Sequence, residues 1–221
     1  MSGSMTSDNA YTVRILKYTG ILFLVVLLLG CGSQQVTVEG NYPKPLITPI
    51  PLKLGLLLKP EFQQHQYHYQ AKESRDSELI IDTGLSQTLM INTITAAMFK
   101  TVTKLDALPS IDSPANVDAI LVPTIEEFQH AVPNHTKINV FEIWVKYRFQ
   151  LLTPEGVTIA DWYMSAYGKT PSQFMDSAAE SINLAAVVAF RDAGANFSLN
   201  FSRIPEVKLW LDDNIGAGAN P

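Results

Sequence analysis

Residues 140–152 alternate apolar and polar side chains with a period of two, the pattern of a strand with one face in the core and one in water. The segments 117–128 and 157–167 flank it, and the intervening residues 153–156 place Pro at the second and Gly at the fourth position of a turn. The pattern therefore predicts a three-stranded antiparallel meander. Six apolar residues are assigned to its core face: Phe141, Ile143, Val145, Tyr147, Phe149 and Leu151.

Apolar residues recur with helical spacing between residues 85 and 105. Asp82 and Thr83 precede this stripe as candidate caps, and Pro109 follows it, so one helix is predicted here.

A second helix is predicted to begin at Thr170 and to run to Gly194. Thr170 would be its N-cap, Pro171 its first helical residue and Gln173 the partner in a capping box. Alanines on its apolar face would let this helix lie close to the sheet.

Shorter segments complete the fold. Residues 53–58 read as a buried strand, residues 62–70 and 78–81 as a hairpin, and residues 197–211 as a loop or short strand anchored by Trp210. The elements together predict an α+β fold with a single antiparallel-rich sheet and two helices packed on one face.

Nine consecutive apolar residues, 21–29, mark the amino-terminal region. This run is much shorter than the roughly 20 residues that a membrane-spanning helix needs. Arg14 and Lys17 precede it, as the basic residues of a secretory signal do. Residues 1–30 are therefore predicted to be a signal peptide, with Met1 or Met5 as its start.

The sequence Leu28-Leu29-Gly30-Cys31 resembles the bacterial lipobox. The resemblance implies cleavage before Cys31, a diacylglycerol on its sulfur and acylation of the new amino group. Because Gly32 and Ser33 follow rather than Asp, it also implies an outer-membrane location facing the periplasm. Two or three acyl chains, each worth about 0.8 kcal/mol per buried CH₂, would anchor the protein firmly.

Cys31 is the only cysteine of the 221 residues, so the chain cannot form an intramolecular disulfide. A core thiol and a catalytic nucleophile are the alternatives to lipid attachment at this position.

The predicted organisation has four parts. The signal peptide (1–30) is followed by the lipidated Cys and a Pro-rich tether (31–50), a single periplasmic domain (51–211) and a flexible tail (212–221). Four prolines stiffen the tether region: Pro43, Pro45, Pro49 and Pro51.

With 47% hydrophobic and 17% charged residues, the composition excludes a mostly disordered protein. Removal of residues 1–30 takes away two basic residues and one acidic residue, and changes the net charge from −5 to −6. The mature chain has no basic patch that would follow nucleic-acid phosphates, so no nucleic-acid partner is expected.

Candidate chemistry is sparse. Glu61, His65 and His68 have a spacing that could hold zinc on a helix, but in a strand residues three apart point to opposite faces. Asp161 has no acid or base partner nearby in the sequence, and no nucleophile elbow or Gly-rich phosphate loop follows a strand. We therefore expect no metal, no cofactor, no catalytic residue and no enzymatic activity; a hydrolase would need a cluster formed only on folding.

Large amphipathic rings are the remaining signal, with Tyr67, Tyr69, Trp144 and Trp210 as candidate interface residues. Trp144 shares its strand face with Glu142, Lys146 and Arg148. It would be either an exposed anchor for a partner or a ring packed beneath the tether or the carboxyl-terminal segment.

The predicted order of elements over about residues 50–211 resembles the small α/β domain shared by the TolB amino-terminal domain, the curli secretion lipoprotein and the Pel export lipoprotein. This resemblance implies a non-enzymatic accessory or scaffold subunit in cell-envelope assembly or export, which binds envelope proteins or further copies of itself. The alternative is an auxiliary lipoprotein that binds a lipid or another small apolar ligand for a transport system, in a cleft between sheet and helix.

Overall fold

The computed structural model describes residues 34–70, 78–133, 139–172 and 177–216. The larger of its two sheets has the strand order β5-β2-β6-β7-β8. β2 pairs in parallel with β5 and β6, whereas β6, β7 and β8 pair antiparallel. The predicted meander is thus confirmed. The strand bounds are Ile50–Leu57 (β2), Phe99–Leu105 (β5), Ala119–Ala131 (β6), Val140–Leu152 (β7) and Thr158–Pro171 (β8).

The turn between β7 and β8 forms as its sequence indicates. The backbone N–H of Gly156 donates to the carbonyl of Thr153 at 2.9 Å. Gly156 has a φ of 88°, a left-handed conformation that glycine adopts without strain.

A second sheet of three strands has the order β1-β4-β3, with bounds Gln34–Thr37 (β1), Gln66–Tyr69 (β3) and Leu79–Asp82 (β4). β3 and β4 pair antiparallel, which confirms the predicted hairpin, although a short helix (α2, Pro60–Gln63) occupies the start of the segment expected to be extended. The single sheet of the prediction is therefore wrong: the described residues form two sheets.

β1 comes from the segment that was predicted to be a tether. It pairs in parallel with β4, and Val36, Val38 and Tyr42 are buried in the main core. Residues 34–42 thus belong to the folded body, because Val36, Val38 and Tyr42 are buried by partners far away in the sequence.

The first predicted helix is shorter than its apolar stripe. α3 spans Gly84–Met98, and the chain then turns directly into β5. Residues 101–103 are Thr-Val-Thr, and β-branched side chains favour strands over helices. Thr83 is the N-cap residue as expected, but its side chain makes no capping hydrogen bond.

The second predicted helix begins later than expected. Thr170 and Pro171 end β8, and α5 spans Ala178–Asn200 with Ser177 as its N-cap; Gln173 lies outside the described residues. The hydroxyl of Ser177 accepts a hydrogen bond from the backbone N–H of Glu180 at 3.1 Å. Thr170 is instead buried in the strand, paired with Phe141.

The carboxyl-terminal segment is helical rather than a loop or strand. A 3₁₀ turn (η1, Phe201–Arg203) leads into α6 (Pro205–Gly216), so the described residues carry four α-helices, not the two predicted. Pro205 at the start of α6 suits the first helical position, where its missing N–H is not needed.

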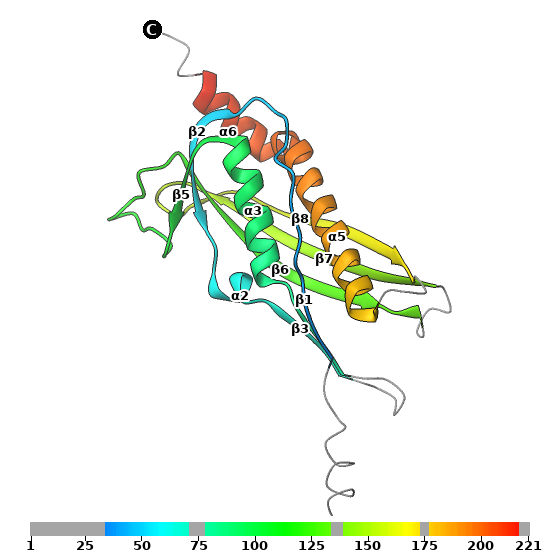
Figure 1. Ribbon diagram of the computed structural model, residues 1–221. Coiled ribbons are helices and arrows are strands. Elements are labelled where there is room, and N and C mark those ends of the chain that lie inside the picture. The colour runs from blue at the N-terminus through cyan, green and yellow to red at the C-terminus, as the bar shows by residue number, and fades with distance from the viewer. Residues whose placement is uncertain (1–33, 71–77, 134–138, 173–176, 217–221) are drawn as a thin grey trace, which may run out of the picture.

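Helices α3 and α5 lie on one face of the larger sheet (Figure 1). The close approach of α5 to β8 is confirmed: a Cβ on Gly168 would lie 2.1 Å from the carbonyl oxygen of Ala185. Tyr147 and Phe149 of β7 meet Phe190 and Phe197 of α5 in the core between the layers. No helix within the described ranges is long and apolar enough to cross a membrane.

Candidate functional site

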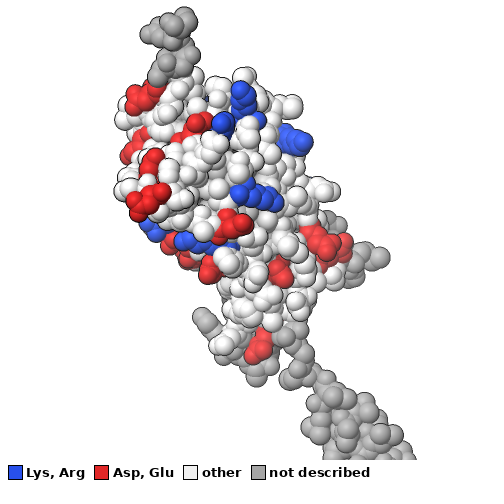
Figure 2. Space-filling view, turned by 90° about the vertical axis from the view of Figure 1, so that its left-hand side faces the viewer, with Lys and Arg blue, Asp and Glu red and all other residues white. Residues whose placement is uncertain are grey.

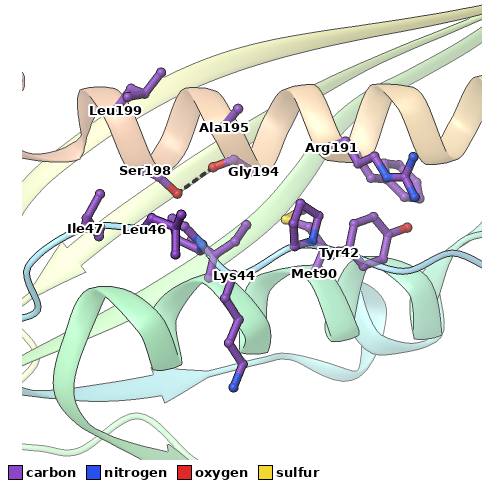
Figure 3. A pocket seen from close by; sticks show the side chains of 14 residues that line it. Tyr42, Lys44, Leu46, Ile47, Met90, Arg191, Gly194, Ala195, Ser198 and Leu199 are labelled. Atoms are coloured by element: carbon purple, nitrogen blue, oxygen red, sulfur yellow. Dashed lines mark hydrogen bonds between the residues drawn. The ribbon is translucent and has the colours of Figure 1, made fainter.

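An apolar cleft lies between α3, α5 and the extended residues 42–47 (Figure 3). Its volume is about 310 Å³, at the lower end of the range for small-molecule sites. Met90, Ile94 and Phe190 contribute buried apolar side chains to its lining. The cleft thus presents an apolar floor to whatever enters it.

The outer wall of the cleft belongs to a segment that we call the strap, residues 39–47. Its backbone is held on α5 by two side chains: Asn183 Oδ1 accepts from the Glu39 N–H at 2.8 Å, and Arg191 Nε and Nη2 each donate to the Asn41 carbonyl at 3.1 Å. Tyr42 also forms a buried hydrogen bond with Ser86 of α3 at 2.6 Å. The strap is therefore fixed to both helices at its start.

Two small residues of α5, Gly194 and Ala195, determine the shape of the cleft. A Cβ on Gly194 would lie 2.6 Å from Ile94 Cδ1, so glycine lets the two helices come close at the floor. Ala195 is exposed and lines the space, where a larger side chain would fill it.

The rim of the cleft exposes aliphatic side chains. Leu46 is fully exposed, Leu199 is 60% exposed and Ile47 is 37% exposed. These three residues lie around one opening, so the rim of the cleft is apolar as well as its floor. An apolar occupant would remove this surface from water.

Tyr42 and Ser198, two polar residues of the cleft, form hydrogen bonds within the protein. Ser198 Oγ donates to the Gly194 carbonyl at 2.8 Å, within α5. Burial raises the pKa of Tyr42, partly offset by its hydrogen bond to Ser86 and by the charge of Arg191. This arrangement suits the binding of an apolar molecule, with Arg191 as the charged group at one end.

A second surface, which we call the open sheet face, is the side of β6–β8 opposite the helices. Trp144 is 39% exposed there and packs on Tyr167 with ring centroids 4.9 Å apart. Tyr167 in turn donates to Glu142 Oε1 at 2.6 Å. In the described part of the chain Trp144 therefore lies against a neighbouring strand, not beneath the tether or the carboxyl-terminal segment.

Charged side chains continue the open sheet face. Lys146 Nζ lies 4.8 Å from the ring centroid of Tyr163, and Arg148 forms a bidentate ion pair with Asp161, with contacts of 2.6 to 3.2 Å. Asp161, the candidate acid or base, is thus paired with Arg148. The hydrogen bond from Arg148 lowers the pKa of the Asp161 carboxyl.

The other candidate interface residues lie elsewhere. Tyr67 packs on Phe128 at 5.1 Å, and its hydroxyl is 3.2 Å from His130 Nδ1; the Tyr69 ring meets His130 edge-on at 4.7 Å. Trp210 of α6 is partly buried against the main core. The structure therefore does not bring Tyr67, Tyr69, Trp144 and Trp210 together into one surface.

Cys31, the predicted lipid attachment point, lies outside the described residues, as does the predicted signal peptide. The described residues contain no group of three side chains that could hold a metal ion. His65 is instead paired with Thr83, 2.6 Å away, and His68 is exposed on β3.

Charges of both signs are interspersed among uncharged residues on the face that Figure 2 shows. That face carries no continuous basic patch.

The sequence led us to expect a ligand cleft between sheet and helix, not one between α3, α5 and the strap, because the strap was assigned to the Pro-rich tether. One signal was present: Leu46 and Ile47 are adjacent aliphatic residues within the Pro-rich segment, where a tether would carry polar ones.

No family model matches the sequence, and no curated protein matches it. Solved structures with a related arrangement include a Xanthomonas campestris protein of the DUF330 family, at 9% identity and a TM-score of 0.47, covering 84% of this chain and 96% of that one. A minor lipoprotein of Acinetobacter baumannii matches at 11% identity and a TM-score of 0.36, covering 71% of this chain and 94% of that one. A Neisseria meningitidis lipoprotein matches at 15% identity and a TM-score of 0.29, covering 61% and 94%.

Proposed function

We propose that this protein is a non-enzymatic lipoprotein, anchored in the outer membrane through acylated Cys31, that serves as an auxiliary protein and holds an apolar ligand in its cleft. The anchor rests on the lipobox-like sequence 28–31. The cleft itself carries the ligand-binding role: a cavity of about 310 Å³ with a buried apolar floor and a rim of exposed aliphatic side chains. The body would face the periplasm.

Binding in such a site is driven by the apolar surface removed from water, at roughly 25 cal/mol per Å². Leu46 and Leu199 expose most of their side chains beside the opening. A ligand that covers both side chains therefore gains binding free energy from the burial of each. A partly pre-formed cavity also lowers the ordering cost of binding, since the strap is already fixed to α3 and α5.

Native mass spectrometry of the full chain, extracted from envelopes in mild detergent, tests this proposal. We expect an adduct beyond the anchor's own acyl groups. Ala195→Trp places a large ring in the cleft and should remove the adduct. Val188→Trp, at another exposed position of α5 that does not line the cleft, is the matched control and should keep it. An adduct that survives Ala195→Trp, or that never occurs in the wild-type chain, contradicts the proposal.

A second candidate function is that of a scaffold subunit in envelope assembly or export, favoured by the open sheet face. Trp144 is 39% and Tyr163 55% exposed on adjacent strands, and aromatic residues are frequent anchors of protein interfaces. Its partner would be an envelope protein or a second copy of this chain.

Site-specific photo-crosslinking in cells tests the scaffold role. A photoreactive residue at position 144 should give adducts of discrete mass, whereas the same residue at Leu209, 65% exposed on α6, should not. Equal crosslinking at both positions, or none at 144, would exclude the open sheet face as the interface.

A further inference from the structure

The two ends of the cleft differ in chemistry. Arg191 and Tyr42 lie at one end, and Leu46, Ile47 and Leu199 lie at the other (Figure 3). Leu199 lies eight positions after Arg191 on α5, which corresponds to about 12 Å along the helix axis. A ligand lying along the cleft therefore has one end next to a cation and the other end next to aliphatic side chains.

The charges around the cleft have one sign. Of the fourteen described residues that line it, two are cationic, Lys44 and Arg191, and none is acidic. This contrasts with the whole chain, whose net charge is −5. The ammonium of Lys44 points away from α5, whereas the guanidinium of Arg191 lies beside Tyr42 at the end of the cleft (Figure 3).

Arg191 is held in place by the strap. Its Nε and Nη2 donate to the Asn41 carbonyl, which fixes the plane of the guanidinium, and the side chain is still exposed to solvent. A guanidinium offers five N–H donors, so three are left for a carboxylate or phosphate oxygen outside the strap.

We infer that the ligand of the cleft is an anionic amphiphile with a single acyl chain, its head group at Arg191 and its chain directed toward Leu46 and Leu199. This inference rests on the proposed ligand-binding function and specifies the ligand's charge and orientation. The volume of about 310 Å³ suits one chain better than the two chains of a membrane phospholipid.

Displacement of the neutral apolar dye N-phenylnaphthylamine from the full chain tests the inference, with decanoate, decanol and decyltrimethylammonium as competitors of equal chain length. Decanoate should displace the dye at a concentration roughly three- to five-fold lower than decanol, the range of an exposed ion pair, and the ammonium should be the weakest.

Variants locate the charge. Arg191→Gln should abolish the preference for decanoate, and Arg191→Lys, which keeps a donor for the Asn41 carbonyl, should retain much of it. The readout is the ratio of the decanoate and decanol concentrations that displace the dye from one variant, so a change in dye affinity caused by a loosened strap does not imitate the effect. Lys44→Gln removes an equal charge from the same cleft and should leave the preference intact. Loss of preference in Lys44→Gln but not in Arg191→Gln would overturn the orientation.

The two proposals fail separately. If the dye binds, Ala195→Trp prevents its binding, and decanoate displaces it no better than decanol, then the inference of an anionic ligand is wrong but the apolar binding site is supported. If the dye does not bind, or binds equally well to Ala195→Trp, both the inference and the ligand-binding function are wrong.

Discussion

Tyr147 of β7 donates a hydrogen bond to Gln87 Oε1 of α3 at 2.6 Å, and both side chains are completely buried. Gln87 Nε2 donates onward to Thr83 Oγ1 at 2.6 Å, and Thr83 is paired with His65 at the same distance. This polar chain joins the centre of the larger sheet to the start of α3. Because Tyr147, Gln87 and Thr83 are completely buried, the two hydrogen bonds that join them are costly to lose.

Replacement of Gln87 by Leu should therefore lower the free energy of unfolding by about 1–3 kcal/mol, since it leaves the Tyr147 hydroxyl buried without its acceptor. Tyr147→Phe should cost a similar amount by leaving Gln87 Oε1 without its donor. In the double variant the loss should be smaller than the sum, as expected for two residues that share one bond. Urea denaturation measures all three, and strictly additive losses would show that the bond contributes nothing.

Gly168→Ala should be among the most damaging single substitutions in the protein. The added Cβ would lie 2.1 Å from the Ala185 carbonyl oxygen and 2.3 Å from the Ala189 nitrogen, and both are backbone atoms of α5 that cannot swing aside. We expect a loss of about 3 kcal/mol or more in unfolding free energy. Ser165→Ala, on the same strand but facing away from α5, is the control and should change stability little; a stable Gly168→Ala variant would mean that α5 does not lie so close to β8.

The stability of the protein should fall as the solution becomes mildly acidic, in part through His65. Burial lowers the pKa of His65, opposed by the charge of Asp82, so the folded state binds this proton less readily than the unfolded state. The contribution is complete above the ordinary histidine pKa of about 6.5 and is lost as the pH falls from there through the lower folded-state value.

Urea midpoints measured between about pH 7 and pH 5 should show this decline, and His65→Gln should flatten it. A slope that is unchanged in His65→Gln would assign the pH dependence to other groups.

Local patterns predicted the parts of the fold that depend on neighbouring residues. The alternation of β7, the turn at Gly156 and the β3–β4 hairpin all follow from side chains within a few positions of one another. β1 could not be found in this way, because Val36 and Val38 are buried by contacts with elements more than forty residues away.

The cleft illustrates the same limit at the candidate site. Met90 and Ile94 lie within the predicted helical segment 85–105 and Phe190 lies within the second predicted helix, but the sequence did not show that the two helices would line one cleft. Its wall depends on Arg191 holding the Asn41 carbonyl, a contact across 150 positions that no local pattern contains. Leu46 then becomes a rim residue only because the strap is held there.

Cys31→Ser should abolish lipid attachment and leave either an uncleaved precursor or a soluble periplasmic protein. The physical reason is that the serine hydroxyl lacks the nucleophilic thiolate that accepts the diacylglycerol, while the apolar run 21–29 still directs export. Labelled palmitate should enter the wild-type chain and a Ser33→Ala control, and should be absent from Cys31→Ser. Palmitate incorporated into the Cys31→Ser chain would show that the lipid is attached to another residue. A wild-type chain that is membrane-bound but unlabelled would show that a protein partner, not a lipid, holds it at the membrane.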